Sequence, residues 1–180
     1  MIQRIAEASA RFKARLAGGL WLLSFLVAAF TETFVHGPSK IAGGLIAVLG
    51  MVVVTLLLYG VFKPVSKGLS LLAAISSFVG LGFEALRWQP RGMNVAIVFS
   101  GIYCLLLGYL IFRSTFLPRP LGPLMAVAGL GWLTYLSSPL ANYLSPYNLA
   151  LGVLGEALVM LWLLVIGLNA QKWSEQPRGE

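Results

Sequence analysis

Three glutamates, Glu32, Glu84 and Glu156, lie inside long apolar stretches of the chain. A carboxylate in such a stretch is costly unless it reaches water, pairs with a cation or serves a site. Arg87 follows Glu84 by three residues, which on a helix places both side chains on one face. Together these residues predict an acidic pocket for a cation, a proton or a small cationic or zwitterionic solute. Glu156 would be its central acid and Arg87 its counter-charge.

The same residues also have structural interpretations. Glu84 and Arg87 would then form a structural ion pair, and Glu32 would extend along its apolar stem to reach the lipid headgroups. For Glu156 both interpretations stay open, because no basic residue lies near it in the sequence. A pocket requires the four charged side chains to converge on one cavity that water can enter, whereas structural roles leave them scattered or paired.

Residues for catalysis or metal binding form no recognisable set. An intramembrane serine protease would need a histidine to accept the proton of a serine such as Ser100. The only histidine, His36, lies at the end of the first apolar run, and the last run has none. A His/Cys metal site lacks ligands, since Cys104 is the only cysteine, and a carboxylate-only site would require three helices to converge. We therefore expect no enzymatic activity, no cofactor and no metal.

The elements that position these residues are those of a membrane protein. The chain has 180 residues, of which 58% are hydrophobic and 11% are charged, with a net charge of +7. A soluble domain of this size cannot bury so many apolar side chains, whereas lipid accepts them. Because the basic residues lie at the ends of apolar runs, they predict anchors at a lipid bilayer rather than a nucleic-acid surface.

Six apolar runs are each close to the roughly 20 residues that a helix needs to cross a bilayer. Backbone groups in lipid must be paired within their own segment, so we expect an all-α polytopic membrane protein with six transmembrane helices. The fifth run is short and ends near Pro139, which allows either a kinked helix or a helix followed by an interfacial segment. The runs are residues 17–35, 41–62, 69–88, 93–112, 121–135 (or 121–143 where the fifth continues) and 148–168.

Residues 1–16 are polar and basic, with apolar residues near one helical face, which predicts an amphipathic helix at the membrane interface. A signal peptide is the alternative, but the following apolar run is long for one and lacks a clear cleavage site. We expect the six-helix transmembrane domain to occupy residues 17–172 and a short polar cytoplasmic tail to occupy residues 173–180.

The placement of lysine and arginine predicts the orientation. With the N-terminus inside, ten of these residues lie on the inner side and three on the outer side, so both termini are expected in the cytoplasm. Arg113, Pro118 and Arg119 predict a stiff cytoplasmic turn that anchors the topology. The inner set is Arg4, Arg11, Lys13, Arg15, Lys63, Lys67, Arg113, Arg119, Lys172 and Arg178, and the outer set is Lys40, Arg87 and Arg91.

Two pairs of segments resemble each other at nearly equal offsets. Residues 58–63 (LYGVFK) resemble residues 108–113 (GYLIFR) at an offset of 50, and residues 80–83 (GLGF) resemble residues 129–132 (GLGW) at an offset of 49. Helices two–three and four–five would then form a parallel repeat of one hairpin. The alternative is a chance match, which apolar glycine-rich sequence also produces.

The stretch CLLLGYLIFRS at residues 104–114, followed by FLPR at residues 116–119, resembles the central signature of a family of small bacterial membrane proteins. The family is known as domain of unknown function 4386, and the resemblance covers most of the membrane part. It implies a multi-pass protein of the bacterial inner membrane, with no agreed activity. The chain differs from the family pattern at Tyr103, where a histidine often precedes the cysteine, and at Thr115, where glycine is usual.

Two functions remain after these exclusions. The first is a non-catalytic integral inner-membrane protein that binds or passes a small solute or cation through an outward-facing acidic pocket. The alternative is a structural or accessory membrane subunit with no ligand of its own, which packs against a membrane partner or a second copy. A cavity that opens on the outer side and contains Glu156 would favour the first.

Overall fold

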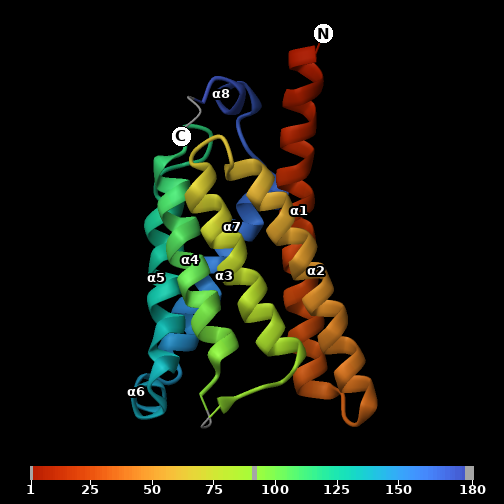
Figure 1. Cartoon of the computed structure of the whole chain (residues 1–180), viewed down its shortest axis with the longest axis vertical. Coiled ribbons are helices and arrows are strands. Elements are labelled where there is room, and N and C mark those ends of the chain that lie inside the picture. The colour runs from red at the N-terminus through yellow and green to blue at the C-terminus, as the bar shows by residue number, and fades with distance from the viewer. Residues whose placement is uncertain (1, 91–92, 177–180) are drawn as a thin grey trace.

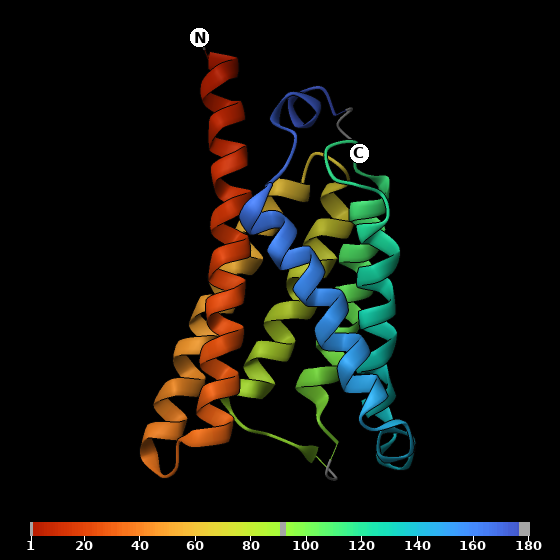
Figure 2. The same ribbon diagram turned by 180° about the vertical axis from the view of Figure 1, so that it is seen from behind.

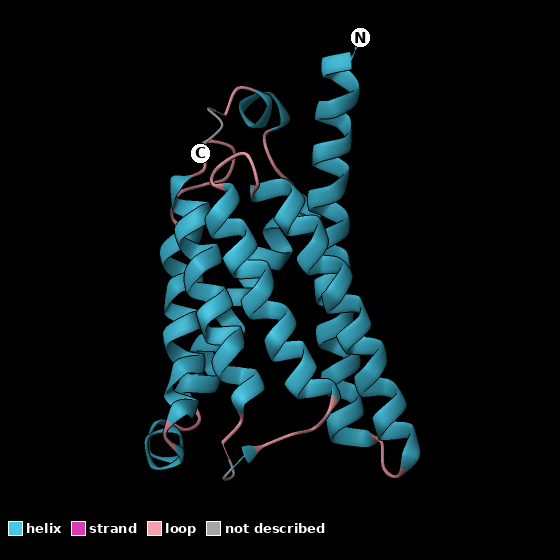
Figure 3. Ribbon diagram, in the orientation of Figure 1, coloured by secondary structure: helices cyan, strands magenta, loops and turns pink. Residues whose placement is uncertain are grey.

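The helices of the computed structural model, which describes residues 2–90 and 93–176, run lengthwise in one bundle (Figure 1). Arg91 and Arg178, which enter the charge count, lie outside the described residues. The regular elements of the described part are all helical (Figure 3). They are α1 (Ile2–Phe34), α2 (Pro38–Phe62), α3 (Lys67–Ala85), α4 (Val95–Arg113), α5 (Leu121–Leu133), the 3-10 helix η2 (Thr134–Leu136), α6 (Ser138–Leu144), α7 (Tyr147–Val165) and α8 (Ala170–Ser174).

The two ends of the bundle differ in what they carry. The N-terminus of α1, the turn between α4 and α5 and the short helix α8 lie at one end, which we call the α8 end (Figure 1). The opposite end, called the α6 end, carries α6 and the connections from α1 to α2 and from α3 to α4. Helix α7 crosses the bundle diagonally on the face that is turned to the viewer in Figure 2. It begins beside α5 near the α6 end and ends beside α1 near the α8 end.

Five described helices are long and apolar enough to cross a membrane. Many of their large apolar side chains, such as Leu23 and Leu154, face outward, as expected of a surface that contacts lipid. The prediction of an all-α protein with several membrane-length helices is therefore confirmed, whereas the count of six spans, the orientation and the repeat stay predictions. The five segments are Ala8–Phe34, Pro38–Phe62, Lys67–Ala85, Val95–Arg113 and Tyr147–Val165.

The fifth apolar run forms two helices. Helix α5 continues through η2 to Leu136, and the backbone at Ser137 is then extended before α6 begins. Pro139 lies in the first turn of α6, where its missing N–H is not needed for a helical hydrogen bond. The structure therefore has a helix followed by a separate short helix rather than one kinked helix, and the position of the short helix at the membrane interface stays a prediction.

Neither end of the predicted transmembrane domain coincides with the end of a helix. Helix α1 continues through residue 16 without a break, and α8 includes both Lys172 and Trp173. The Trp173 indole N–H donates to the carbonyl of Val61 at 2.9 Å, which ties α8 to the bundle. The division into an interfacial helix, a spanning domain and a tail concerns the position of the membrane and stays a prediction.

The turn between α4 and α5 is fixed at the α8 end of the bundle. The Ser114 hydroxyl donates to the carbonyl of Ile111 at 2.8 Å, and the Asn169 amide donates to the carbonyl of Phe116 at 3.0 Å. Arg113 and Arg119 are exposed in this turn, where they could reach headgroups of a surrounding bilayer. Their role as a topological anchor stays a prediction.

Helices α4 and α5 contact each other backbone to backbone at two pairs of glycines. A Cβ atom on Gly108 would lie 2.7 Å from the carbonyl oxygen of Gly122, and one on Gly122 would lie 2.7 Å from that of Gly108. Nearer the α6 end, a Cβ on Gly129 would lie 2.7 Å from the carbonyl oxygen of Gly101. Small residues permit such close approach of membrane helices, and this contact sets the position of α5.

Candidate functional site

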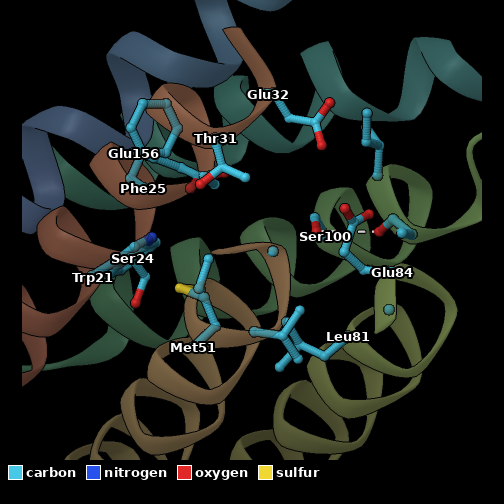
Figure 4. Close-up of a pocket in the computed structure, with 17 residues that line it drawn as sticks. Trp21, Ser24, Phe25, Thr31, Glu32, Met51, Leu81, Glu84, Ser100 and Glu156 are labelled. Atoms are coloured by element: carbon cyan, nitrogen blue, oxygen red, sulfur yellow. Dashed lines mark hydrogen bonds between the residues drawn. The ribbon is translucent and has the colours of Figure 1, made fainter. Parts of the chain in front are cut away.

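The four charged residues predicted to form a pocket line one cavity in the half of the bundle nearer the α6 end. This cavity has a volume of about 580 Å³ and is lined by Glu32, Glu84, Arg87 and Glu156. A second cavity of about 210 Å³ shares the three glutamates and extends between α2 and α3. Figure 4 shows these glutamates, which come from α1, α3 and α7, around one open space.

Glu156 is the buried acid of this cavity. Only 9% of the residue is exposed. Its Oε1 accepts hydrogen bonds from the indole N–H of Trp132 at 2.6 Å and from the thiol of Cys104 at 3.3 Å. Both partners are donors without formal charge, and none of the ion pairs found among the described residues includes Glu156. The carboxyl group is thus oriented by the protein without a cationic partner among the described residues.

Glycine at position 152 explains how the Trp132 indole reaches Glu156. Gly152 lies one helical turn before Glu156 on α7, and a Cβ atom there would overlap the indole of Trp132. The absent side chain lets the ring pack closely against α7, where its N–H donates to the carboxyl group. Sequence reasoning missed Trp132 and Cys104 as partners, because both lie in apolar runs and meet Glu156 only through the packing of α4, α5 and α7.

Glu32 forms an ion pair with Lys40 across the turn between α1 and α2. Their side chains approach to 2.7 Å, and the Glu32 side chain is 60% exposed. An exposed pair of this kind contributes little to stability. Glu32 therefore lines the cavity with its negative charge compensated by Lys40. Its side chain pairs within the protein, in addition to any contact with lipid headgroups.

The prediction that Glu84 and Arg87 share one helix face is wrong. Helix α3 ends at Ala85, and Arg87 has a left-handed backbone conformation with φ of 50°. Its guanidinium group donates to the carbonyl of Lys40 at 3.3 Å, so it reaches from the end of α3 to the start of α2. Glu84 is exposed and has no basic partner among the described residues.

Aromatic rings form much of the remaining wall around the acids. Trp21 and Phe25 of α1 line the smaller cavity, and Trp132 lines the larger one. At the mouth, the rings of Phe83 and Trp88 stack with their centroids 5.2 Å apart. Ring faces attract cations, and the attraction increases where water is excluded.

The site offers no cluster that suits a metal ion. Within residues 2–90 and 93–176, no group of three or more histidine, cysteine, aspartate or glutamate side chains could hold one. Glu32, Glu84 and Glu156 therefore line one space without converging on a single point. The arrangement can offer an organic cation a buried carboxyl group, a second carboxylate at Glu84 and aromatic contacts, with Arg87 at the rim for an anionic group.

Comparisons with known proteins give a family similarity without an assigned activity. An uncharacterised protein of the archaeon Archaeoglobus fulgidus is 29% identical to this chain over 139 residues, which cover 71% of this chain and 83% of the relative. No solved structure matches the chain. Residues 81–167, from the end of α3 through α7, match the family described as Domain of unknown function (DUF4386). The chain thus resembles this family, as the arginine–proline turn and its flanking runs predict.

Proposed function

We propose that the chain is a non-catalytic integral membrane protein that binds a small organic cation, or a zwitterion with a cationic end, in its acidic cavity. Six helices cross the plasma membrane of a bacterium, including the shorter α5. The α8 end lies in the cytoplasm and the cavity faces outward. This orientation is supported by Lys63, Lys67, Arg113 and Lys172 near the α8 end, since basic residues favour the cytoplasmic side.

The observation that carries this proposal is the buried Glu156 carboxyl group, which lines a cavity and has no cationic partner among the described residues. A carboxylate removed from water is costly unless a positive charge compensates it. Trp132 and Cys104 fix its orientation, and the aromatic walls favour a cation with an apolar body. A bound organic cation would supply the missing charge, and the same cavity would let it enter from the outer side.

A binding titration tests this function. Benzyltrimethylammonium combines one positive charge with an aromatic ring and cannot donate a proton, so it probes the cavity without acid–base chemistry. We expect saturable binding to the full chain in nanodiscs, measured by isothermal titration calorimetry, and no comparable binding of the neutral analogue neopentylbenzene. If neither compound binds, the chain is better explained as an accessory subunit that packs against a partner or against itself.

The six-span topology makes a separate prediction for cysteine labelling. In a Cys104→Ser background, Lys63→Cys and Lys172→Cys should both resist a membrane-impermeant maleimide applied to intact cells. Tyr143→Cys, on α6 and exposed, should be labelled. An odd number of spans would place positions 63 and 172 on opposite sides of the membrane, so labelling of only one of them would contradict the proposed topology.

A further inference from the structure

A third, much smaller cavity lies between α2, α3 and α4, toward the α8 end. It leaves about 10 Å³ for the centre of a water molecule, which is close to the minimum space that one water needs. Its wall is mainly apolar, including Leu58 and Leu107, but four hydroxyl-bearing residues also line it: Thr55, Tyr59, Ser70 and Tyr103. None of the charged residues of the acidic cavity contributes to it.

Two of these hydroxyl groups are buried without a hydrogen-bond partner. Ser70 is 2% exposed and Tyr103 is 5% exposed, and neither Ser70 Oγ nor Tyr103 Oη has a partner among the described residues. A buried hydroxyl without a partner costs free energy, and folded proteins nearly always pair such groups with protein or with ordered water. Both groups line the same small cavity from different helices, α3 and α4.

The Thr55 hydroxyl offers a third contact. It donates to the carbonyl of Met51 at 2.9 Å, so the 2.7 Å contact with the Ser77 hydroxyl is one in which Ser77 donates. The Thr55 oxygen therefore still has a lone pair that can accept another hydrogen bond. A buried water typically makes about three hydrogen bonds, and the hydroxyl groups of Ser70, Tyr103 and Thr55 provide that number.

We propose that one ordered water molecule occupies this cavity and bridges Ser70, Tyr103 and Thr55. The water satisfies both buried hydroxyl groups and joins α2, α3 and α4, next to the direct hydrogen bond between Thr55 and Ser77 that already joins α2 and α3. This site does not depend on the proposed cation binding, because it uses different residues in another part of the bundle.

The location of the water site relates it to the acidic cavity. Met51 of α2 and Gly80 of α3 line the cavity of about 210 Å³, whereas Thr55 and Ala74 line the water site. On α3, Ser77, whose hydroxyl contacts that of Thr55 at 2.7 Å, lies between Gly80 and Ala74. The water site thus follows the Thr55–Ser77 hydrogen bond along the seam of α2 and α3, on the side away from the acidic cavity.

Thermal unfolding of the full chain in detergent tests the water site. If a water bridges the hydroxyl groups, Ser70→Ala and Tyr103→Phe should each lower the Tm by about 2–4 °C, the shift that a chain of this size shows for the loss of about 1 kcal/mol. The double variant should lose little more than either single variant, because the first substitution already removes the bridge. Tyr147→Phe is the matched control, since Tyr147 is 73% exposed and lines none of these cavities.

Two outcomes would overturn the proposal. Removal of an unpaired hydroxyl from an empty cavity relieves a penalty, so an unchanged or higher Tm for Tyr103→Phe would show that no water is bound there. Strictly additive losses in the double variant would show that the two hydroxyl groups do not share a partner. If the chain shows these Tm effects but does not bind the cation, the proposed cation site is refuted and the water site is not.

Discussion

Glu156→Gln should weaken the binding of benzyltrimethylammonium by at least about tenfold, which corresponds to 1.4 kcal/mol. Among the described residues that line the cavity, Glu156 is the only buried one with an ionisable side chain, so a bound cation would lose its compensating partner in the variant. The bundle should stay folded, because the glutamine oxygen can still accept the hydrogen bond from Trp132 that Glu156 accepts at 2.6 Å. Calorimetry in nanodiscs measures the affinity, and thermal unfolding checks the fold.

The control for this prediction is Glu175→Gln. Glu175 is exposed at the α8 end, where its carboxylate accepts a hydrogen bond from the Gln171 side chain at 3.2 Å. Its substitution by glutamine removes one carboxylate from the chain, as Glu156→Gln does. The affinity of the Glu175→Gln variant for benzyltrimethylammonium should equal that of the original chain. Equal affinities for Glu156→Gln and the original chain would refute the role of Glu156, even if the chain binds the probe elsewhere.

Trp132→Phe makes the orientation of Glu156 testable apart from its charge. The substitution keeps an aromatic ring against Gly152 but removes the indole N–H that donates to the carboxyl group. We expect a loss of affinity that is smaller than the loss for Glu156→Gln, since the charge remains while its position becomes less fixed. Tyr135→Phe, on the adjacent 3-10 helix and outside the acidic cavity, should leave the affinity unchanged.

The sequence indicates the helices and the buried acid because both depend on local patterns. Apolar runs of membrane length give the helices, and the absence of any basic residue near Glu156 singles it out. The position of Arg87 could not be predicted in the same way, since the spacing rule holds only if the helix continues. The structure ends α3 at Ala85, and Arg87 then reaches the start of α2.

The contacts that orient Glu156 depend on packing between helices that are distant in the sequence. Trp132 and Cys104 lie 24 and 52 residues from Glu156, respectively. Nothing in the local pattern distinguishes a tryptophan that bonds a buried acid from one that only packs against lipid. In the sequence, Gly152 looks like any glycine that lets two helices pack closely. Its role in admitting the indole can be recognised only once the structure shows Trp132 against it.

Gly108→Ala and Gly122→Ala should each lower the free energy of unfolding by about 1–3 kcal/mol, the usual cost of forcing an added methyl group into a packed contact. At either position the new Cβ would meet the backbone of the facing helix at 2.7 Å. Backbone atoms cannot rotate away as the end of a side chain can, so α4 and α5 would have to separate. Thermal and denaturant unfolding in detergent measure the loss.

Gly60→Ala is the matched control, because a Cβ atom at Gly60 in α2 would meet nothing within 4 Å. Alanine is the better helix former, so this variant should be as stable as the original chain or more stable. A similar loss for all three variants would mean that the α4–α5 contact is not what the substitutions disturb.

Since α5 also carries Trp132, Gly129→Ala at the pair nearer the α6 end should weaken cation binding as well as folding, whereas Gly122→Ala should mainly affect folding.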